Sequence, residues 1–87
     1  MTQFQSNQEF YEFVRVLAQD LEESGKQSAS MMLTDGLACI NGLTDGWAAF
    51  LESVENVQRS FGEELKSSDA ERVEEIRMAA HKAVYRS

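Results

Sequence analysis

Two side chains of this 87-residue chain could act together as a nucleophile and a base, namely Cys39 and His81. A catalytic pair requires the thiol and the imidazole within hydrogen-bond reach of each other. Nothing in the sequence around either residue marks them as partners, and a small buried thiol is the usual role of a lone cysteine. One cysteine and one histidine are also too few ligands for a zinc site. We therefore expect no enzymatic activity and no cofactor.

The tetrapeptide Leu-Thr-Asp-Gly occurs twice, at residues 33–36 and 43–46, and a repeated acidic loop could bind a metal ion. Asp35 and Asp45 are the only hard ligands in this stretch. The alternating oxygen ligands of an EF-hand and its closing glutamate are missing. The sequence therefore predicts no metal site.

The two copies of the tetrapeptide are predicted to have different structural roles. Gly36 falls within an apolar stripe of helical spacing, where a glycine allows close approach of another helix, and the stripe that begins at Trp47 is a candidate neighbour. The alternative is that Asp35 and Gly36 form a turn that splits this segment in two. Thr44 precedes the next apolar run and is predicted to cap a helix.

Other catalytic and nucleic-acid motifs are also missing from the sequence. There is no glycine-rich phosphate loop, nucleophile elbow or H-E-x-x-H motif. A helix-turn-helix reader would place Asp45, Glu52 and Glu55 on its recognition helix against Arg59 alone. That sign of charge is wrong for phosphate, so we expect no nucleic-acid partner.

The formal net charge of −7 is unevenly distributed along the chain. Residues 1–58 contain nine acids and two bases, whereas residues 59–87 contain six of each. Such a field would repel anionic membranes and attract a basic protein. The alternative is that the acidity only keeps a small protein soluble. Because no segment approaches ~20 apolar residues, no signal peptide is evident and no disulfide can form within the chain, we expect a cytoplasmic protein without membrane contact.

Apolar residues recur at helical spacing in four segments that are separated by glycines and polar residues. We expect an all-α, small antiparallel four-helix bundle that forms a single domain over residues 1–87. The predicted helices cover residues 7–24, 27–41, 44–61 and 68–86.

Local signals predict where several of these helices begin and end. Ser6 and Ser68 each precede a glutamate by three residues, which is the spacing of a capping box. Gly25 and Gly62 are predicted stop residues. Gln58 lies inside the apolar stripe of the third helix and needs a hydrogen-bond partner if it is buried.

Three residues of the fourth predicted helix, Met78, His81 and Tyr85, fall away from its apolar core face. Tyr11 and Ala18 form a smaller off-core pair on the first helix. Aromatic residues and methionine are enriched at protein interfaces, so both sets are candidate binding surfaces. The alternative is that the fourth helix buries two of its faces.

Residues 10–57 begin with FYEFVRVLAQDLEESGK, continue through a second helical segment to an Asn-Gly loop, and end in a Thr-capped apolar helix. In this pattern the chain resembles a group of small acidic bacterial helical proteins, many of them uncharacterised. Some are encoded beside toxins and are thought to act as immunity proteins, so the resemblance implies protein binding. Gly46 and Trp47 depart from the pattern at the start of the third helix. No functional residue is carried over from the group.

The sequence therefore leads to two hypotheses about function. In the first, the protein is a non-enzymatic module whose acidic first two-thirds docks a basic protein. In the second, it is a small helical protein that self-associates as a homodimer. The candidate contacts for that homodimer are Met78, His81 and Tyr85, or the first helix. The candidate partner-binding residues are Met78, His81, Tyr85, Tyr11, Glu22, Glu23, Glu52 and Glu55.

Overall fold

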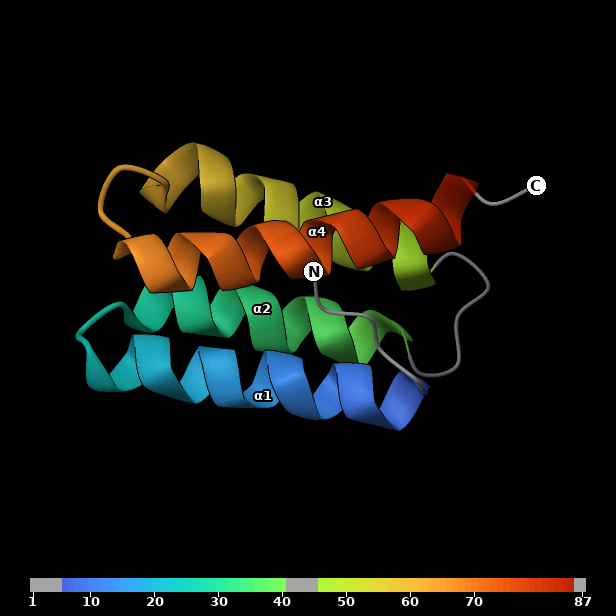
Figure 1. The fold of residues 1–87 in the computed structure, drawn as a ribbon, viewed down its shortest axis with the longest axis horizontal. Coiled ribbons are helices and arrows are strands. Elements are labelled where there is room, and N and C mark those ends of the chain that lie inside the picture. The colour runs from blue at the N-terminus through green and yellow to red at the C-terminus, as the bar shows by residue number, and fades with distance from the viewer. Residues whose placement is uncertain (1–5, 41–45, 86–87) are drawn as a thin grey trace.

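Four helices form an antiparallel bundle in the computed structural model, which describes residues 6–40 and 46–85. Figure 1 shows that successive helices alternate in direction. The helices are α1 (Asn7–Glu23), α2 (Gln27–Ile40), α3 (Gly46–Phe61) and α4 (Ser67–Tyr85). The predicted all-α fold class is thus confirmed. The expected end of the second helix at 41, the cap at Thr44 and the last helical residue at 86 lie outside the described residues.

The predicted start of α1 is confirmed by its capping hydrogen bond, and its predicted last residue, 24, is one residue too far, because the helix ends at Glu23 with Ser24 as its C-cap. The hydroxyl of Ser6 accepts a hydrogen bond from the backbone N–H of Glu9 at 3.1 Å. At the other end, Gly25 has a φ of 87°. The N–H of Gly25 donates to the carbonyl of Glu22, and the N–H of Lys26 donates to the carbonyl of Leu21. This pair of bonds is a Schellman motif, which satisfies carbonyls that the helix end leaves open.

The predicted start of α4 is wrong by one residue. The helix begins at Ser67, and the N–H of Ala70 donates to the carbonyl of Lys66. Ser68 therefore lies inside the first turn rather than at the cap position. The carboxylate of Asp69, also in the first turn, is buried. There a negative charge is favoured by the helix dipole.

The core is built from the apolar faces of all four helices. An aromatic group at one end joins α1 to α3, since the ring of Phe10 lies 5.3 Å from that of Trp47 and 5.6 Å from that of Phe50. The buried apolar residues are Phe10, Val14, Leu17, Ala18, Leu21, Ala29, Leu33, Leu37, Ile40, Phe50, Leu51, Val54, Val57, Val73, Ile76 and Ala80. The predicted stripes of α1, α3 and α4 are recognisable in this set.

The four helices follow one another around the bundle, and their contacts are unequal. The α2–α3 pair has the most extensive backbone contact, α1–α2 and α3–α4 have less, and α1–α4 has the least. Within the described residues, α1 and α3 occupy opposite corners, as do α2 and α4, because neither pair has neighbouring backbone. The seam between α1 and α4 is thus where the bundle closes most loosely.

The close approach of α2 and α3 depends on the two glycines of the repeated tetrapeptide. Gly36 is helical and buried, so the prediction of a helix is confirmed and the alternative of a turn is wrong. A Cβ atom on Gly36 would lie 2.8 Å from the Cβ of Ser53 on α3. A Cβ atom on Gly46 would collide with the backbone of Cys39 and Ile40 on α2. Gly46, which departs from the resemblance, therefore has a packing role.

Replacing Gly36 with alanine is expected to destabilise the bundle by about 1–2 kcal/mol. Overpacking against Ser53 costs about 1–3 kcal/mol, and the better helix propensity of alanine offsets up to ~1 kcal/mol of that. Urea unfolding of Gly36→Ala measures the change. The matched test is Ser53→Gly, alone and combined with Gly36→Ala, because it removes the two atoms that the new methyl group would meet most closely. The two substitutions should couple favourably by roughly 1 kcal/mol, whereas additive effects would show that this contact does not limit helix approach.

Candidate partner-binding surfaces

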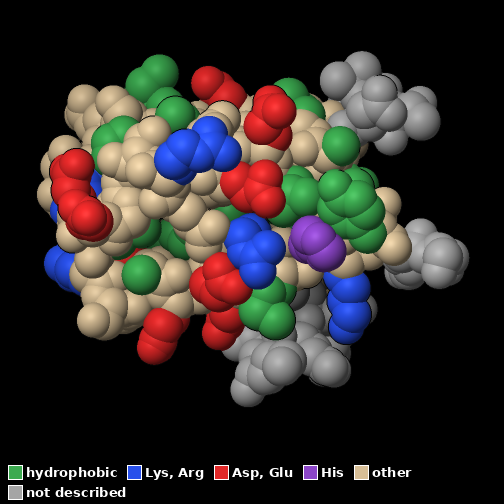
Figure 2. Space-filling model, turned by 90° about the horizontal axis from the view of Figure 1, so that it is seen from above, with side chains coloured by type: hydrophobic (Ala, Val, Ile, Leu, Met, Phe, Trp, Pro, Cys, Tyr) green, Lys and Arg blue, Asp and Glu red, His purple; other side chains and the backbone are tan. Residues whose placement is uncertain are grey.

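Met78, His81 and Tyr85, which we call the α4 patch, lie on the solvent-facing side of α4 towards its C-terminal end. Met78 is 46% exposed and Tyr85 is 68% exposed, and both are among the most exposed large apolar side chains of the described residues. The rings of His81 and Tyr85 lie 4.5 Å apart. Figure 2 shows the histidine in purple, with apolar side chains and acidic and basic groups on the same face.

The second predicted surface, Tyr11 with Ala18, does not form. Ala18 is 2% exposed and belongs to the core, so its off-core assignment is wrong. Tyr11 is half-buried and packs against the core, with its ring edge-on to Phe10 at 6.3 Å. Because α1 packs against both α2 and α4, the arc that it buries is wider than the single stripe that periodicity indicates.

The four candidate glutamates lie on two different helices. Glu22 and Glu23 are exposed at the C-terminal end of α1. On α3, Glu52 is exposed and Glu55 is half-buried. Since α1 and α3 occupy opposite corners of the bundle, these side chains do not form one continuous acidic surface. Glu55 instead faces α4, where its charge acts on the guanidinium of Arg77 and raises the pKa of that group, although less than Glu74 does.

A polar network joins α3 to α4 and supplies the partner expected for Gln58. The amide nitrogen of Gln58 donates to Glu74 Oε1 at 2.9 Å. Arg77 donates to both carboxylate oxygens of Glu74, at 2.9 and 2.8 Å. Hydrogen bonds from Arg77 and then Gln58 lower the pKa of Glu74 to about 2, against a smaller opposing effect of burial. The network holds Glu74 ionised over the ordinary pH range.

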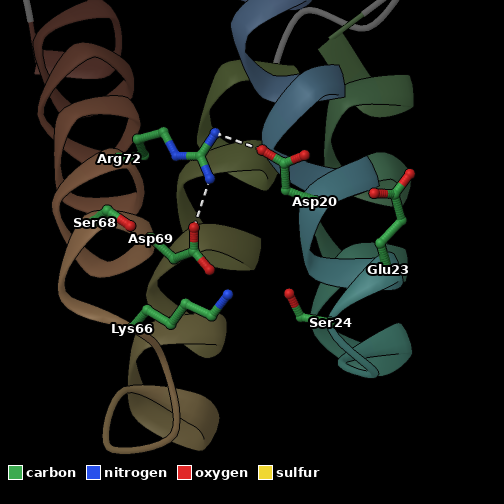
Figure 3. A pocket seen from close by; sticks show the side chains of 7 residues that line it. All are labelled: Asp20, Glu23, Ser24, Lys66, Ser68, Asp69 and Arg72. Atoms are coloured by element: carbon green, nitrogen blue, oxygen red, sulfur yellow. Dashed lines mark hydrogen bonds and ion pairs between the residues drawn. The ribbon is translucent and has the colours of Figure 1, made fainter.

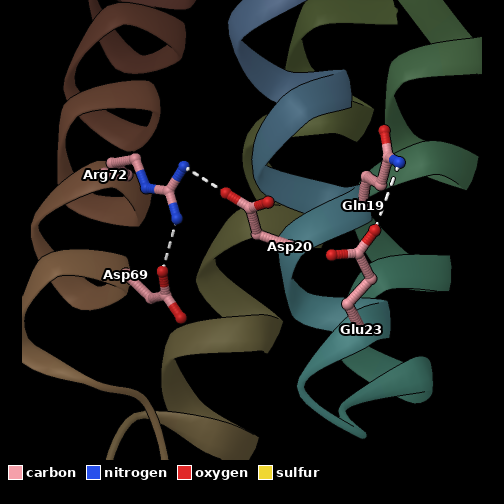
Figure 4. A network of polar contacts seen from close by, with 5 residues as sticks. All are labelled: Gln19, Asp20, Glu23, Asp69 and Arg72. Atoms are coloured by element: carbon pink, nitrogen blue, oxygen red, sulfur yellow. Dashed lines mark hydrogen bonds and ion pairs between the residues drawn. The ribbon is translucent and has the colours of Figure 1, made fainter.

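A second network joins α1 to α4 through Arg72 (Figure 4). Arg72 donates to Asp20 of α1 at 2.9 Å and also to Asp69, one turn away on α4. The side chain of Asp69 is 6% exposed, whereas that of Asp20 is 46% exposed. Burial alone would lower the pKa of Arg72, but its hydrogen bonds to Asp69 and Asp20 outweigh that effect and raise it. Arg72 therefore neutralises a buried carboxylate and ties α1 to α4.

The i,i+3 spacing of Asp69 and Arg72 was the only sequence signal for this network. From the sequence, no role was predicted for Arg72. The contact with Asp20 spans 52 positions in the chain. No local pattern indicates a pair at that separation.

Two hollows lie along this seam, one on each side of Arg72. The first, of about 400 Å³, is shown in Figure 3 and is lined by Asp20, Glu23, Ser24, Lys66, Ser68, Asp69 and Arg72. The second, of about 300 Å³, is lined by Glu9, Glu12, Phe13, Val16 and Arg72. We call the two together the α1–α4 groove. Sequence reasoning did not predict this groove, because it depends on which helices are neighbours.

The residues considered for catalysis are not brought together as a site. Cys39 is half-buried on α2, and His81 is exposed on α4, at opposite corners of the bundle. Over residues 6–40 and 46–85, no three His, Cys, Asp or Glu side chains are grouped so that they could hold a metal ion. Among the same residues, no helix has the length and apolar character needed to cross a membrane.

Comparison of the chain with protein-family models, with curated proteins and with solved structures finds no significant match. Function is therefore argued from the surfaces described above.

The α3–α4 network generates a pH-dependent prediction at Glu74. Its pKa is lowered from 4.5 to about 2 on folding, so its contribution is complete above pH 4.5 and is lost as the pH falls towards 2. The side chain is 47% exposed, so solvent screening reduces this contribution to about 1 kcal/mol. Glu74→Gln should therefore be less stable than the wild type at pH 7 by about that amount.

Urea unfolding of the wild type and of Glu74→Gln at pH 7, 4 and 2.5 measures the effect. The difference between the two proteins should shrink as the pH falls. Glu71→Gln, an exposed position one turn earlier on the same helix, is the matched control and should show little difference at any of these pH values. A difference at Glu74 that stays constant with pH would contradict the assignment.

Proposed function

We propose that the protein is a non-enzymatic binding module that docks a basic protein partner through the acidic first two-thirds of its chain. The observation that carries the proposal is the distribution of charge, because the formal −7 resides in residues 1–58 while residues 59–87 are neutral. An acidic surface of this kind suits a protein that inhibits a basic partner by binding to it directly, as an immunity protein binds a toxin. We also place the protein in the cytoplasm, where a lone thiol remains reduced.

The side-chain pairing in the bundle supports this proposal. Each of the four arginines in the described part of the chain donates to a carboxylate or an amide of its own chain; they are Arg15, Arg59, Arg72 and Arg77. By contrast, Glu22, Asp35 and Glu52 are exposed on α1, α2 and α3. These arginines are thus engaged within the fold, and the exposed acids of the first three helices remain available to attract a basic partner.

The absence of enzymatic activity is part of the same proposal. Cys39 lies half-buried on one helix, and His81 is exposed on a helix that is not its neighbour. A nucleophile and its base need to be within hydrogen-bond reach, and this arrangement offers no such pair. Loss of an assayed activity in Cys39→Ala or His81→Ala would count against a pure binding module.

Association with the physiological partner is expected to weaken steeply with salt. After affinity capture of that partner from the native cytosol, binding is measured by calorimetry at about 50 mM and about 300 mM NaCl. Opposite charges at a protein interface act mainly on the rate of association, and salt screens them, so the affinity should fall by about tenfold or more. Binding that is insensitive to salt would contradict the proposal.

Self-association through the α4 patch is the second candidate function. It is favoured by the exposure of Met78 and Tyr85, which are 46% and 68% accessible in a single chain. Such side chains are enriched in protein interfaces. The neutral charge of residues 59–87 also means that two copies of this region would not repel each other strongly.

Sedimentation at a protein concentration of about 100 µM tests self-association, because a specific dimer has a dissociation constant below that value. The wild type should sediment as a dimer, and the double variant Met78→Ser, Tyr85→Ser should sediment as a monomer. Met31→Ser is the matched control, because Met31 is 62% exposed on α2, outside the patch. A monomeric wild type would remove this candidate.

A further inference from the structure

The α1–α4 groove lies along the seam between α1 and α4. Among the adjacent helix pairs, α1 and α4 have the least extensive backbone contact. The hollows of about 400 and 300 Å³ share Arg72 as a lining residue, so they are two ends of one groove bridged by that side chain. α1 lines the groove from Glu9 to Ser24, which is about 21–23 Å of helix at 1.5 Å per residue.

Carboxylate residues border the groove at both ends, the larger hollow is polar, and the smaller hollow is lined mainly by apolar atoms. Five carboxylates line it against two cations, which gives a formal charge of −3; they are Glu9, Glu12, Asp20, Glu23 and Asp69, against Lys66 and Arg72. Phe13 and Val16 stand between the two acidic ends, and Val16 is 50% exposed. An amphipathic helix docks with its apolar face on apolar side chains, which Phe13 and Val16 supply here, and its basic side chains can meet the bordering carboxylates.

We propose that the α1–α4 groove docks an amphipathic helix of a partner protein, with apolar residues of that helix over Val16 and basic residues at both ends. This inference rests on the proposed function and names the surface that performs it. The length of the groove matches about four turns of helix. A second copy of this chain is a poor occupant, because its net charge of −7 has the same sign as the groove.

Asp20 is the carboxylate best placed to receive a basic side chain of the partner. It is half-exposed and borders the larger hollow, where Figure 3 shows its carboxylate turned towards Arg72 of α4. Arg72 also holds Asp69, whose side chain is 6% exposed. A partner cation can therefore share Asp20 while Arg72 continues to neutralise the buried Asp69, so docking does not require the bundle to open.

The test uses a synthetic peptide of leucine and lysine, about 14 residues long, with its leucines on one helical face so that it spans the groove. Titration into the ¹⁵N-labelled wild type is followed by amide NMR. The largest shifts should fall on Glu12, Val16 and Asp20 of α1 and near Arg72 of α4, rather than on α2 and the outer face of α3. This measurement does not depend on any variant being folded.

Charge reversal then separates the groove from the rest of the acidic surface. Glu12→Lys with Glu23→Lys should weaken peptide binding by tenfold or more. Asp35→Lys with Glu52→Lys is the matched control, because both residues are exposed, neither lines the groove, and the change in net charge is identical. The control pair should weaken binding by no more than about threefold through the general field. Circular dichroism checks that all variants remain helical.

Three results would overturn the assignment of the groove. They are equal weakening by the two pairs, shifts spread evenly over all four helices, and no detectable binding of the peptide. None of these would by itself remove the proposed function, whose test is the salt dependence of binding to the captured partner. Conversely, salt-insensitive capture together with groove-specific peptide binding would retain the groove and remove the electrostatic role.

Discussion

The close approach of α2 and α3 is the constraint on which the rest of the bundle depends. Gly36 on α2 and Gly46 at the start of α3 have no side chain in the contact between these helices, where a Cβ atom would meet the opposite helix. Interiors are packed to near-crystalline density, so a single methyl group in such a contact is enough to move the helices apart. α2 and α3 therefore form the central pair, and α1 and α4 are each attached mainly to one member of it.

This arrangement explains why the contact between α1 and α4 relies on a polar side-chain pair. Once α1 packs on α2, and α4 packs on α3, the seam between α1 and α4 has the fewest backbone neighbours. Arg72 crosses that seam to Asp20 while it neutralises the buried Asp69. A buried carboxylate without its cation would cost several kcal/mol, so the pair orients α4 as well as holding it. The groove on either side of Arg72 is a consequence of a seam closed by long side chains.

The sequence was sufficient to predict the helices but not how their charged faces combine. Apolar periodicity, Ser6 and Gly25 predicted the limits of α1, because capping and amphipathicity act within a few residues. Apolar periodicity failed for Ala18, which it placed outside the core. It also failed to show that Glu22 and Glu52 lie on opposite corners of the bundle. Which faces meet is determined by contacts between distant segments, and one sequence contains no direct record of them.

The position of the arginines explains how the charge imbalance survives folding. α4 reaches α1 through Arg72, and Arg77 on the same helix holds Glu74, which also accepts from Gln58 of α3. Arg72 and Arg77 thus hold carboxylates of α4 itself, and Arg72 also pairs with one acid of α1, Asp20. A bundle assembled in this way retains its negative field on the first three helices.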